Sequence, residues 1–240
     1  MQRSITLLPV ILLLLLQSCT KDELTLPAPV QFTFEMVPHE EGNNLKSGPP
    51  PGIPPAGRIR IDKGSLVISS IEFEGRRDEG KDVFFGTNFP EPVTINLDTG
   101  ETSHELTFDI PQGVYNRIEI ILEIGGDNHT PMALEGKVRK GQSDQTPLRF
   151  EYNLRDRIRI RAEPGEQQNR IVLRKDKVTT ARIMVDAGEV FQFINLHSLP
   201  GGIDSLQLTE GTVLISSQVN TGLFNSMASR LERSFRVIFE

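Results

Sequence analysis

The stretch that decides the fold is residues 110–124, which read IPQGVYNRIEIILEI. Four aliphatic residues recur in it at every second position, Ile118, Ile120, Leu122 and Ile124. This period of two places them on one face of a β-strand. Ile121 adds an apolar side chain on the opposite face, so both faces are expected to be covered. The stretch therefore predicts a central strand over residues 114–124.

Short alternating segments, separated by turn-forming residues, recur on both sides of this strand. They predict strands over residues 30–37, 58–62, 65–74, 83–85, 93–97, 105–110, 132–138, 148–154, 157–162, 170–174 and 179–185. Within residues 65–74 the apolar positions change parity, which predicts a β-bulge near Ser69 and Ser70. The pattern favours an antiparallel β-sandwich over residues 30–185, with a Pro- and Gly-rich loop at 38–57.

The last part of the chain, residues 186–240, changes to helical spacing. Asp186 and Glu189 form a capping-box pattern at the start of a helix that is expected to reach Leu196. A second helix is expected to begin after Asn220 or Thr221. Its apolar stripe is Phe224, Met227, Ala228, Leu231 and Phe235. We therefore expect a C-terminal segment with one or two short helices that packs on the sandwich.

Composition narrows the possible function classes. The 240 residues include 26 basic and 32 acidic side chains, and the formal charge of −6 argues against a nucleic-acid partner. The single cysteine excludes an internal disulfide and a cysteine-based zinc cluster. No GxSxG, P-loop, HExxH or Rossmann fingerprint is present, and the four histidines are widely spread. With no tryptophan and two tyrosines, a site that stacks sugar rings is poorly supplied.

We therefore predict no catalytic residue, no metal site and no cofactor. Two alternatives stay open. A carboxylate pair for glycan hydrolysis leaves no sequence signature. Two acidic loops, residues 77–82 and 125–128, are either weak Ca²⁺ sites or ordinary turns.

The N-terminus has the pattern of a cleaved signal peptide. Arg3 precedes an apolar run over residues 7–16, which is too short to span a bilayer. The run ends in LQSC at residues 16–19, which resembles a bacterial lipobox, with Gln17 its least typical member. The resemblance implies cleavage before Cys19 and acylation of that cysteine, for example with palmitate, so that acyl chains hold the protein on the membrane. The alternative is an ordinary cleaved signal.

The residues that follow Cys19 indicate a destination. Lys21, Asp22 and Glu23 resemble the surface-export signal of Bacteroidota lipoproteins. Thr20 stands where an Asp would favour inner-membrane retention. A plain charged tether is the alternative interpretation of this segment. We expect a lipid-anchored protein of the outer membrane that faces the cell surface.

These expectations divide the chain into a signal peptide (1–18), an acylated tether (19–29), a β-sandwich domain (30–185) and a C-terminal helical segment (186–240). Three segments of the domain carry a further resemblance, GSLVISSIEFEG (64–75), DVFF (82–85) and IPQGVY (110–115). They are similar to an uncharacterised family of Bacteroidota lipoprotein domains of transthyretin- or immunoglobulin-like type. The resemblance covers residues 58–185 and carries no known active site.

The most specific part of the resemblance is a Pro-x-Gly-x-Tyr step at Pro111, Gly113 and Tyr115. Because proline and glycine make a tight turn, Tyr115 is expected to bury its ring. Its hydroxyl is then expected to reach a backbone partner, as tyrosines do at sandwich corners.

Residues 149–182 contain ten basic and five acidic side chains, a net charge of +5. Four arginines share one face of the strand predicted at 157–162, and we call them the arginine stripe: Arg155, Arg157, Arg159 and Arg161. The stripe suits an anionic glycan or lipopolysaccharide. The interpretation we favour is pairing with acids of neighbouring strands, either Glu119 and Glu123 or Glu72 and Glu74.

The sequence thus predicts a non-enzymatic, lipid-anchored binding module of the outer membrane. Its expected partners are the membrane, through Cys19, and an anionic glycan or another surface protein. A fimbria-like structural subunit, from which proteolysis at Arg58 or Arg60 removes the first strand, is the main alternative. A glycan-processing enzyme is a further one.

Overall fold

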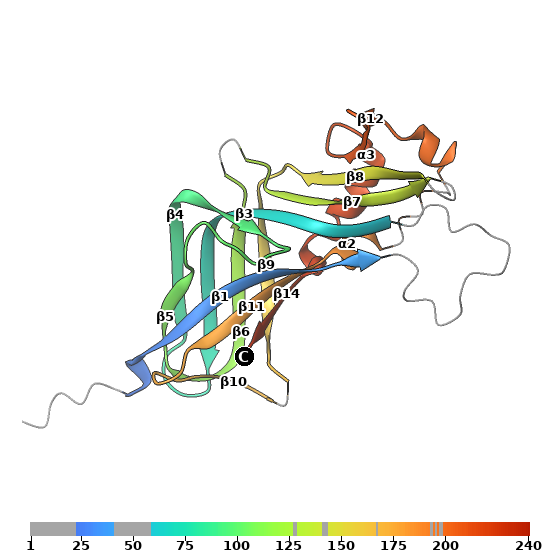
Figure 1. Ribbon diagram of the computed structural model, residues 1–240. Helices are drawn as coiled ribbons and strands as arrows, with labels where there is room; N and C mark the ends of the chain where they lie inside the picture. The colour runs from blue at the N-terminus through green and yellow to red at the C-terminus, as the bar shows by residue number, and fades with distance from the viewer. Residues whose placement is uncertain are drawn as a thin grey trace, which may run out of the picture.

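The computed structural model describes residues 23–40, 59–126, 129–140, 144–166, 168–192, 194, 196 and 199–240. Fourteen strands in these residues form one sheet, and two α-helices lie near one end of it (Figure 1). The first elements in chain order are η2 (Glu23–Thr25), β1 (Pro27–Val37), β2 (His39–Glu40), β3 (Ile59–Arg77), β4 (Val83–Asn96), β5 (Thr107–Pro111), β6 (Gly113–Ile124), β7 (Met132–Lys140), β8 (Asp144–Tyr152) and β9 (Asp156–Pro164). The remaining elements are β10 (Ile171–Leu173), β11 (Thr179–Asp186), α2 (Ala187–Phe191), η4 (Gly202–Ser205), β12 (Leu208–Thr209), β13 (Thr212–Ile215), α3 (Thr221–Ala228), η5 (Glu232–Ser234) and β14 (Phe235–Phe239).

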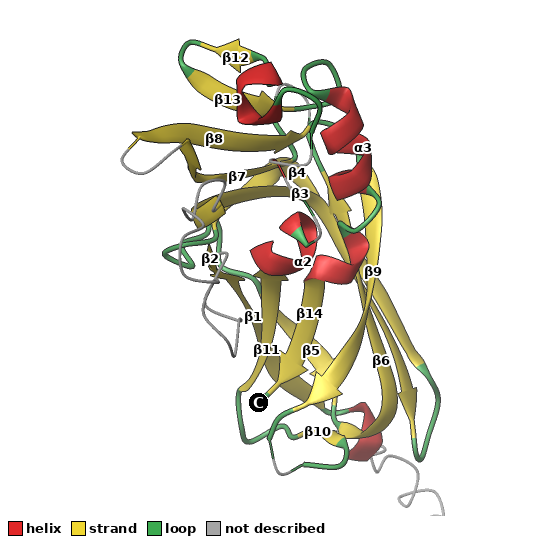
Figure 2. Ribbon diagram, turned by 90° about the vertical axis from the view of Figure 1, so that its right-hand side faces the viewer, coloured by secondary structure: helices red, strands yellow, loops and turns green. Residues whose placement is uncertain are grey.

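The main path of the sheet has the order β12-β13-β8-β7-β3-β6-β9-β14-β11-β1-β5. The long strand β3 also pairs with β2 and β4, and β10 pairs with the start of β6. The sheet curves until its β5 end meets β4, where the rings of Phe85 and Phe108 lie 5.4 Å apart between centroids. Figures 1 and 2 show β1, β11 and β14 running together along the molecule, with α2 at one end of these strands.

The expectation of a purely antiparallel arrangement was wrong, because the sheet is mixed. Strand β1 runs parallel to β11, β14 runs parallel to β9, and β13 runs parallel to β8. Each of these pairs joins segments far apart in the chain. A parallel pair needs such a long connection, since a tight turn can join only antiparallel neighbours. The described residues are nevertheless mainly β, as predicted.

The prediction of a central strand over residues 114–124 is confirmed by β6. It pairs with β3 on one side and β9 on the other, and Ile121 is buried on the face opposite the core. The predicted bulge is also present, since the pairing of β3 shifts register between Ile68 and Ser70 toward both of its neighbours. The bulge keeps Ile68 and Ile71 buried on either side of it.

The predicted tyrosine corner is confirmed. The Tyr115 hydroxyl donates to the Pro111 carbonyl at 2.5 Å, and its buried ring packs edge-on against Phe73. Burial raises the pKa of Tyr115 to about 12. Gly75 makes room for both rings, because a Cβ at that position would lie 2.5 Å from atoms of Phe73 and of Tyr115.

The C-terminal segment agrees with the sequence only in part. Asp186 caps α2, its carboxylate accepting from the Gly188 amide at 2.8 Å, but the helix ends at Phe191 rather than at 196. The second helix, α3, begins at Thr221 as predicted and buries Phe224 and Met227.

Assigning Phe235 to the helical stripe was wrong. Residues 235–239 form β14, which lies inside the sheet between β11 and β9. Three of its side chains, Phe235, Val237 and Phe239, are buried at alternate positions. Two further short strands, β12 and β13, also lie in the segment expected to be helical, and they extend the sheet beyond β8.

Candidate functional site

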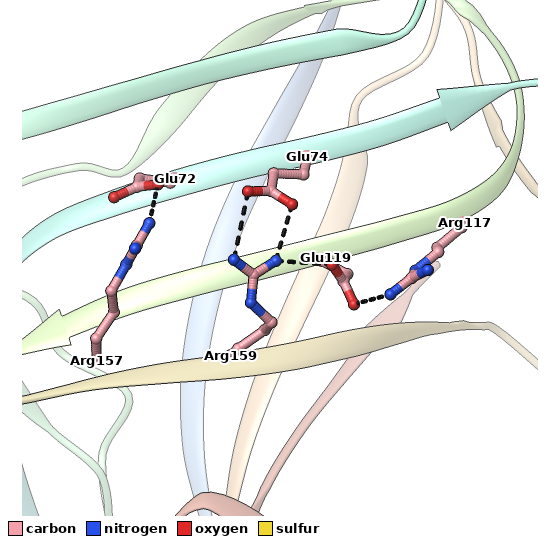
Figure 3. A network of polar contacts seen from close by, with 6 residues as sticks. All are labelled: Glu72, Glu74, Arg117, Glu119, Arg157 and Arg159. Carbon is pink, nitrogen blue, oxygen red and sulfur yellow. Dashed lines mark hydrogen bonds and ion pairs between the residues drawn. The ribbon is translucent and has the colours of Figure 1, made fainter.

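The arginine stripe lies on the outer face of the sheet, where β3, β6 and β9 run side by side. Arg157 contacts Glu72 at 2.5 Å, and Arg159 contacts both Glu74 and Glu119 at 2.8 Å (Figure 3). The register explains these contacts, because the acids extend from β3 and β6 toward the arginines of β9. Glu72 and Glu74 are thus partners of the stripe, and Glu119 is shared.

The sequence reasoning did not single out Arg117 of β6, which extends the same network. Its guanidinium contacts Glu119 at 2.5 Å. That hydrogen bond, supported by a second one from Arg159, lowers the pKa of the Glu119 carboxyl although partial burial works in the opposite direction. The contacts with Glu74 and Glu119 likewise raise the pKa of Arg159. Arg117 and Glu119 are two positions apart on β6, so their side chains lie on the same face of the sheet. This spacing could have predicted the contact from the sequence.

Arg157 and Arg159 are therefore neutralised by ion pairs along the face of the sheet. Glu123 has another role, since one of its carboxylate oxygens accepts from the Ser70 hydroxyl at 3.3 Å. Most of these charged groups are partly exposed to water, so each pair contributes little to stability. Their main effect is to remove two of the four arginines from the set available to an anionic ligand.

The other two members of the stripe differ from this pair. Arg155 lies one residue before β9 and packs against Gly125. Arg161, near the end of β9, is exposed and forms no ion pair with any described residue. The structure thus does not present four equivalent arginines. Glu119 lies opposite Arg161 on β6 but pairs with Arg117 and Arg159, so Arg161 has no ion pair among the described residues.

Arg161 lines a surface pocket of about 490 Å³ formed by the start of β6, the end of β9 and the segment that leads into β10. Arg117 and Arg170 also line it, together with Asn116 and Asn169. The Asp78 carboxylate holds two of these residues in place, because it pairs with Arg170 and accepts from the Asn116 amide at 2.7 Å. Arg117 and Arg170 are already paired with Glu119 and Asp78, and the acid Glu163, which pairs with Arg236, also lines the pocket. The Arg161 guanidinium and the asparagine amides are the donors that remain for a carboxylate, sulfate or phosphate group.

The remaining predicted site residues contribute little here. Cys19, Lys21 and Asp22 lie outside the described residues, and Glu23 begins η2. Among the described residues, no group of three or more His, Cys, Asp or Glu side chains is placed to hold a metal ion. This applies to the loop at 77–82, whereas part of the loop at 125–128 lies outside the described residues.

Comparisons with known proteins found no relative of this chain. No protein-family model, no curated protein and no solved structure matches it. In the part of the chain that the structure describes, every helix is too short or too polar to cross a membrane.

Proposed function

We propose that this protein is a lipid-anchored binding protein of the bacterial outer membrane that faces the cell surface and acts without catalysis. The observation that carries the proposal is the position of the only cysteine. Cys19 follows an apolar run of signal-peptide length, with Gln17 and Ser18 between them, in a sequence that resembles a lipobox. Two or more acyl chains on this residue hold a protein stably on a bilayer. Lys21, Asp22 and Glu23 direct it to the surface.

The fold supports the resemblance to Bacteroidota lipoprotein domains. A mainly β domain with a curved sheet and a buried tyrosine corner at Tyr115 is what that family resemblance implies. We propose that the domain is a β-sandwich of the transthyretin- or immunoglobulin-like type. Such sandwiches serve many functions, so the ligand has to be argued from the surface.

The state of the acids on the outer face supports binding rather than hydrolysis at that face. A glycosidase needs a carboxylic acid whose pKa is raised so that it can protonate a leaving group. The hydrogen bonds from Arg117 and Arg159 instead lower the pKa of the Glu119 carboxyl, which favours its ionised form. Glu72 and Glu74 are engaged by Arg157 and Arg159.

The ligand class that the surface supports best is an anionic glycan, bound at the Arg161 pocket. Arg161 offers a guanidinium that forms no ion pair with any described residue, and the amides of Asn116 and Asn169 line the same pocket. The acid of this pocket, Glu163, is engaged by Arg236. A uronic acid residue presents one carboxylate with neighbouring hydroxyls, which match these donors.

Replacing the cysteine tests the anchor. We expect Cys19→Ala to abolish acylation and to release the protein from the outer-membrane fraction, while Ser18→Ala leaves both intact because a small residue is retained before the cysteine. The mass of the N-terminal peptide and the distribution of the protein between membrane and soluble fractions provide the readout. A Cys19→Ala protein that stays membrane-bound would overturn the proposal.

The same mass spectrum separates the proposal from the fimbria-like alternative. Cleavage at Arg58 or Arg60 would remove β1, which lies between β5 and β11, and leave an N-terminus near Ile59 or Ile61. We expect instead an acylated N-terminus at Cys19 on a monomeric protein. The shortened chain, together with laddered oligomers on gels, would support the structural subunit.

A charge-neutralising pair of variants tests the ligand. We expect Arg161→Gln to weaken binding of oligogalacturonate about tenfold, since one charge-assisted hydrogen bond is lost. Arg157→Gln, whose guanidinium is already engaged by Glu72, is the matched control and should leave affinity unchanged. Titration calorimetry measures both. Equal losses in the two variants, or no binding by the unaltered protein, would contradict this assignment.

A further inference from the structure

The chain enters the domain at one end of the sheet, which we call the tether end. The Arg77 guanidinium donates to the Leu24 carbonyl at 2.5 Å, and the Gln112 amide donates to the Leu26 carbonyl at 2.8 Å. The Gln112 side chain in turn accepts from the Lys175 amide at 3.3 Å. Figures 1 and 2 show the start of β1 and the β10 region at this same end, far from β12, β13 and α3. The entry point is therefore fixed against the turn that contains Lys175.

That turn, residues 174–177, is strongly basic, and we call it the basic turn. Arg174, Lys175 and Lys177 are exposed, and none of them forms an ion pair with a described residue. The turn closes through the Lys177 amide, which donates to the Arg174 carbonyl at 3.3 Å. Asp176 is its single acid, so the basic turn has a net charge of +2.

Two exposed valines flank the basic turn. Val172 is 40% exposed and Val178 is 54% exposed, and both stand out because they are apolar side chains at a charged surface. Basic groups interleaved with exposed apolar side chains are the composition that binds at the headgroup layer of an anionic membrane. The adjacent segment 76–82, with three basic and three acidic residues, is neutral and does not oppose this charge.

The length of the tether brings this end close to the bilayer. Only four residues lie between Cys19 and Leu24, so five Cα–Cα steps join them. At about 3.5 Å per residue, a fully extended tether spans roughly 18 Å. An acylated Cys19 lies at the lipid headgroups, so the tether end cannot move far from them. Because about 18 Å is the greatest separation, the tether also lets the basic turn approach to within the roughly 8–10 Å over which the surface potential decays.

We infer that the basic turn docks on anionic lipid headgroups and thereby orients the domain on the membrane, with the β12, β13 and α3 end pointing away. The inference rests on the proposed acylation of Cys19. The ligand that binds the basic turn is a phosphate-bearing lipid of the leaflet that carries the acyl chains of Cys19. Contact with the leaflet sets which faces of the domain remain open to other partners.

The orientation can be measured because acylation leaves no free thiol in the chain. A fluorophore is attached to Asp176→Cys at the basic turn or to Thr209→Cys in β12. The acylated protein is then reconstituted into phosphatidylcholine vesicles that contain a headgroup quencher, with or without phosphatidylglycerol. We expect quenching at position 176 to increase at least about twofold when phosphatidylglycerol is present, and quenching at position 209 to remain low.

The charge dependence identifies the groups responsible. In the Asp176→Cys background, Arg174→Gln/Lys175→Gln/Lys177→Gln should abolish the increase. The control Lys63→Gln/Lys137→Gln/Arg139→Gln removes the same charge from β3 and β7 and should preserve it. Equal quenching at positions 176 and 209, or no response to the basic-turn substitutions, would overturn the inference while the mass of acylated Cys19 still supports the anchor. An unmodified Cys19 would instead refute the proposed function, and the inference with it.

Discussion

Gly136→Ala is expected to destabilise the protein by more than about 4 kcal/mol, enough to unfold most of a domain of ordinary stability. Gly136 lies in β7 opposite Ile61 of β3. A Cβ at this position would lie 1.8 Å from the Arg60 carbonyl oxygen and 2.8 Å from the Ile61 Cα. Both are backbone atoms of β3, so no side-chain rotation relieves the overlap. The free energy of unfolding, from chemical denaturation, is the measurement.

Gly222→Ala is the matched control for this prediction. Gly222 lies in the first turn of α3, and a Cβ there would meet no atom within 4 Å. An unfolded chain with alanine instead of glycine has less conformational entropy to lose on folding. The substitution should therefore raise the free energy of unfolding by about 0.5–1 kcal/mol. If Gly136→Ala were as stable as Gly222→Ala, the described pairing of β3 and β7 would be wrong.

Val237→Asp is expected to prevent folding altogether. Val237 is fully buried in β14, where it pairs with Ile183 of β11 and Ala162 of β9. A carboxylate placed there would lose its hydration without gaining a partner, which costs several kcal/mol even when the group takes up a proton. Circular dichroism and the amount of soluble protein would show the loss.

The neighbouring residue provides the control for Val237. Arg236 points to the opposite face of β14, and its guanidinium reaches Glu163 at 3.3 Å with half of its side chain exposed. Arg236→Ala should change stability by less than about 1 kcal/mol. Similar losses in both variants would argue against a strand at residues 235–239.

Features that depend on near neighbours in the chain could be predicted from the sequence. The parity change in residues 65–74 predicted the bulge after Ile68, and the Pro111–Tyr115 spacing predicted the tyrosine corner. The aspartate at 186 predicted the start of α2. In each case the signal and the structure it produces lie within a few residues of one another.

Features that depend on distant partners could not be predicted in this way. Nothing within β1 specifies that its neighbour is β11, nor that the two run parallel. Strand β14 illustrates a competing signal. Phe235 continued a helical stripe from α3, although Phe235, Val237 and Phe239 also alternate. The alternation was the correct signal, because β14 pairs with β11 on one side and β9 on the other, and all three side chains are buried.

The candidate site shows the same division. Parity placed the four arginines of the stripe on one face, but their partners depend on the register of β9 against β6 and of β6 against β3. That register brings Glu72 and Glu74 to Arg157 and Arg159. It also places Glu119 opposite Arg161, but the Glu119 carboxylate pairs with Arg117 and Arg159 instead. No count of charges along the chain distinguishes Arg161 from Arg159.

The position of β14 has a consequence for the timing of folding. Residues 235–239 are synthesised after all the other strands that the structure describes, yet they join β11 to β9 in the middle of the sheet. Until residues 235–239 are made, β9 and β11 each lack one of their neighbouring strands. The pairing of β1 with β11 also joins residues that are about 150 positions apart in the chain. A sheet with such non-local pairing forms slowly. The sheet can therefore be completed only after residues 235–239 have been made.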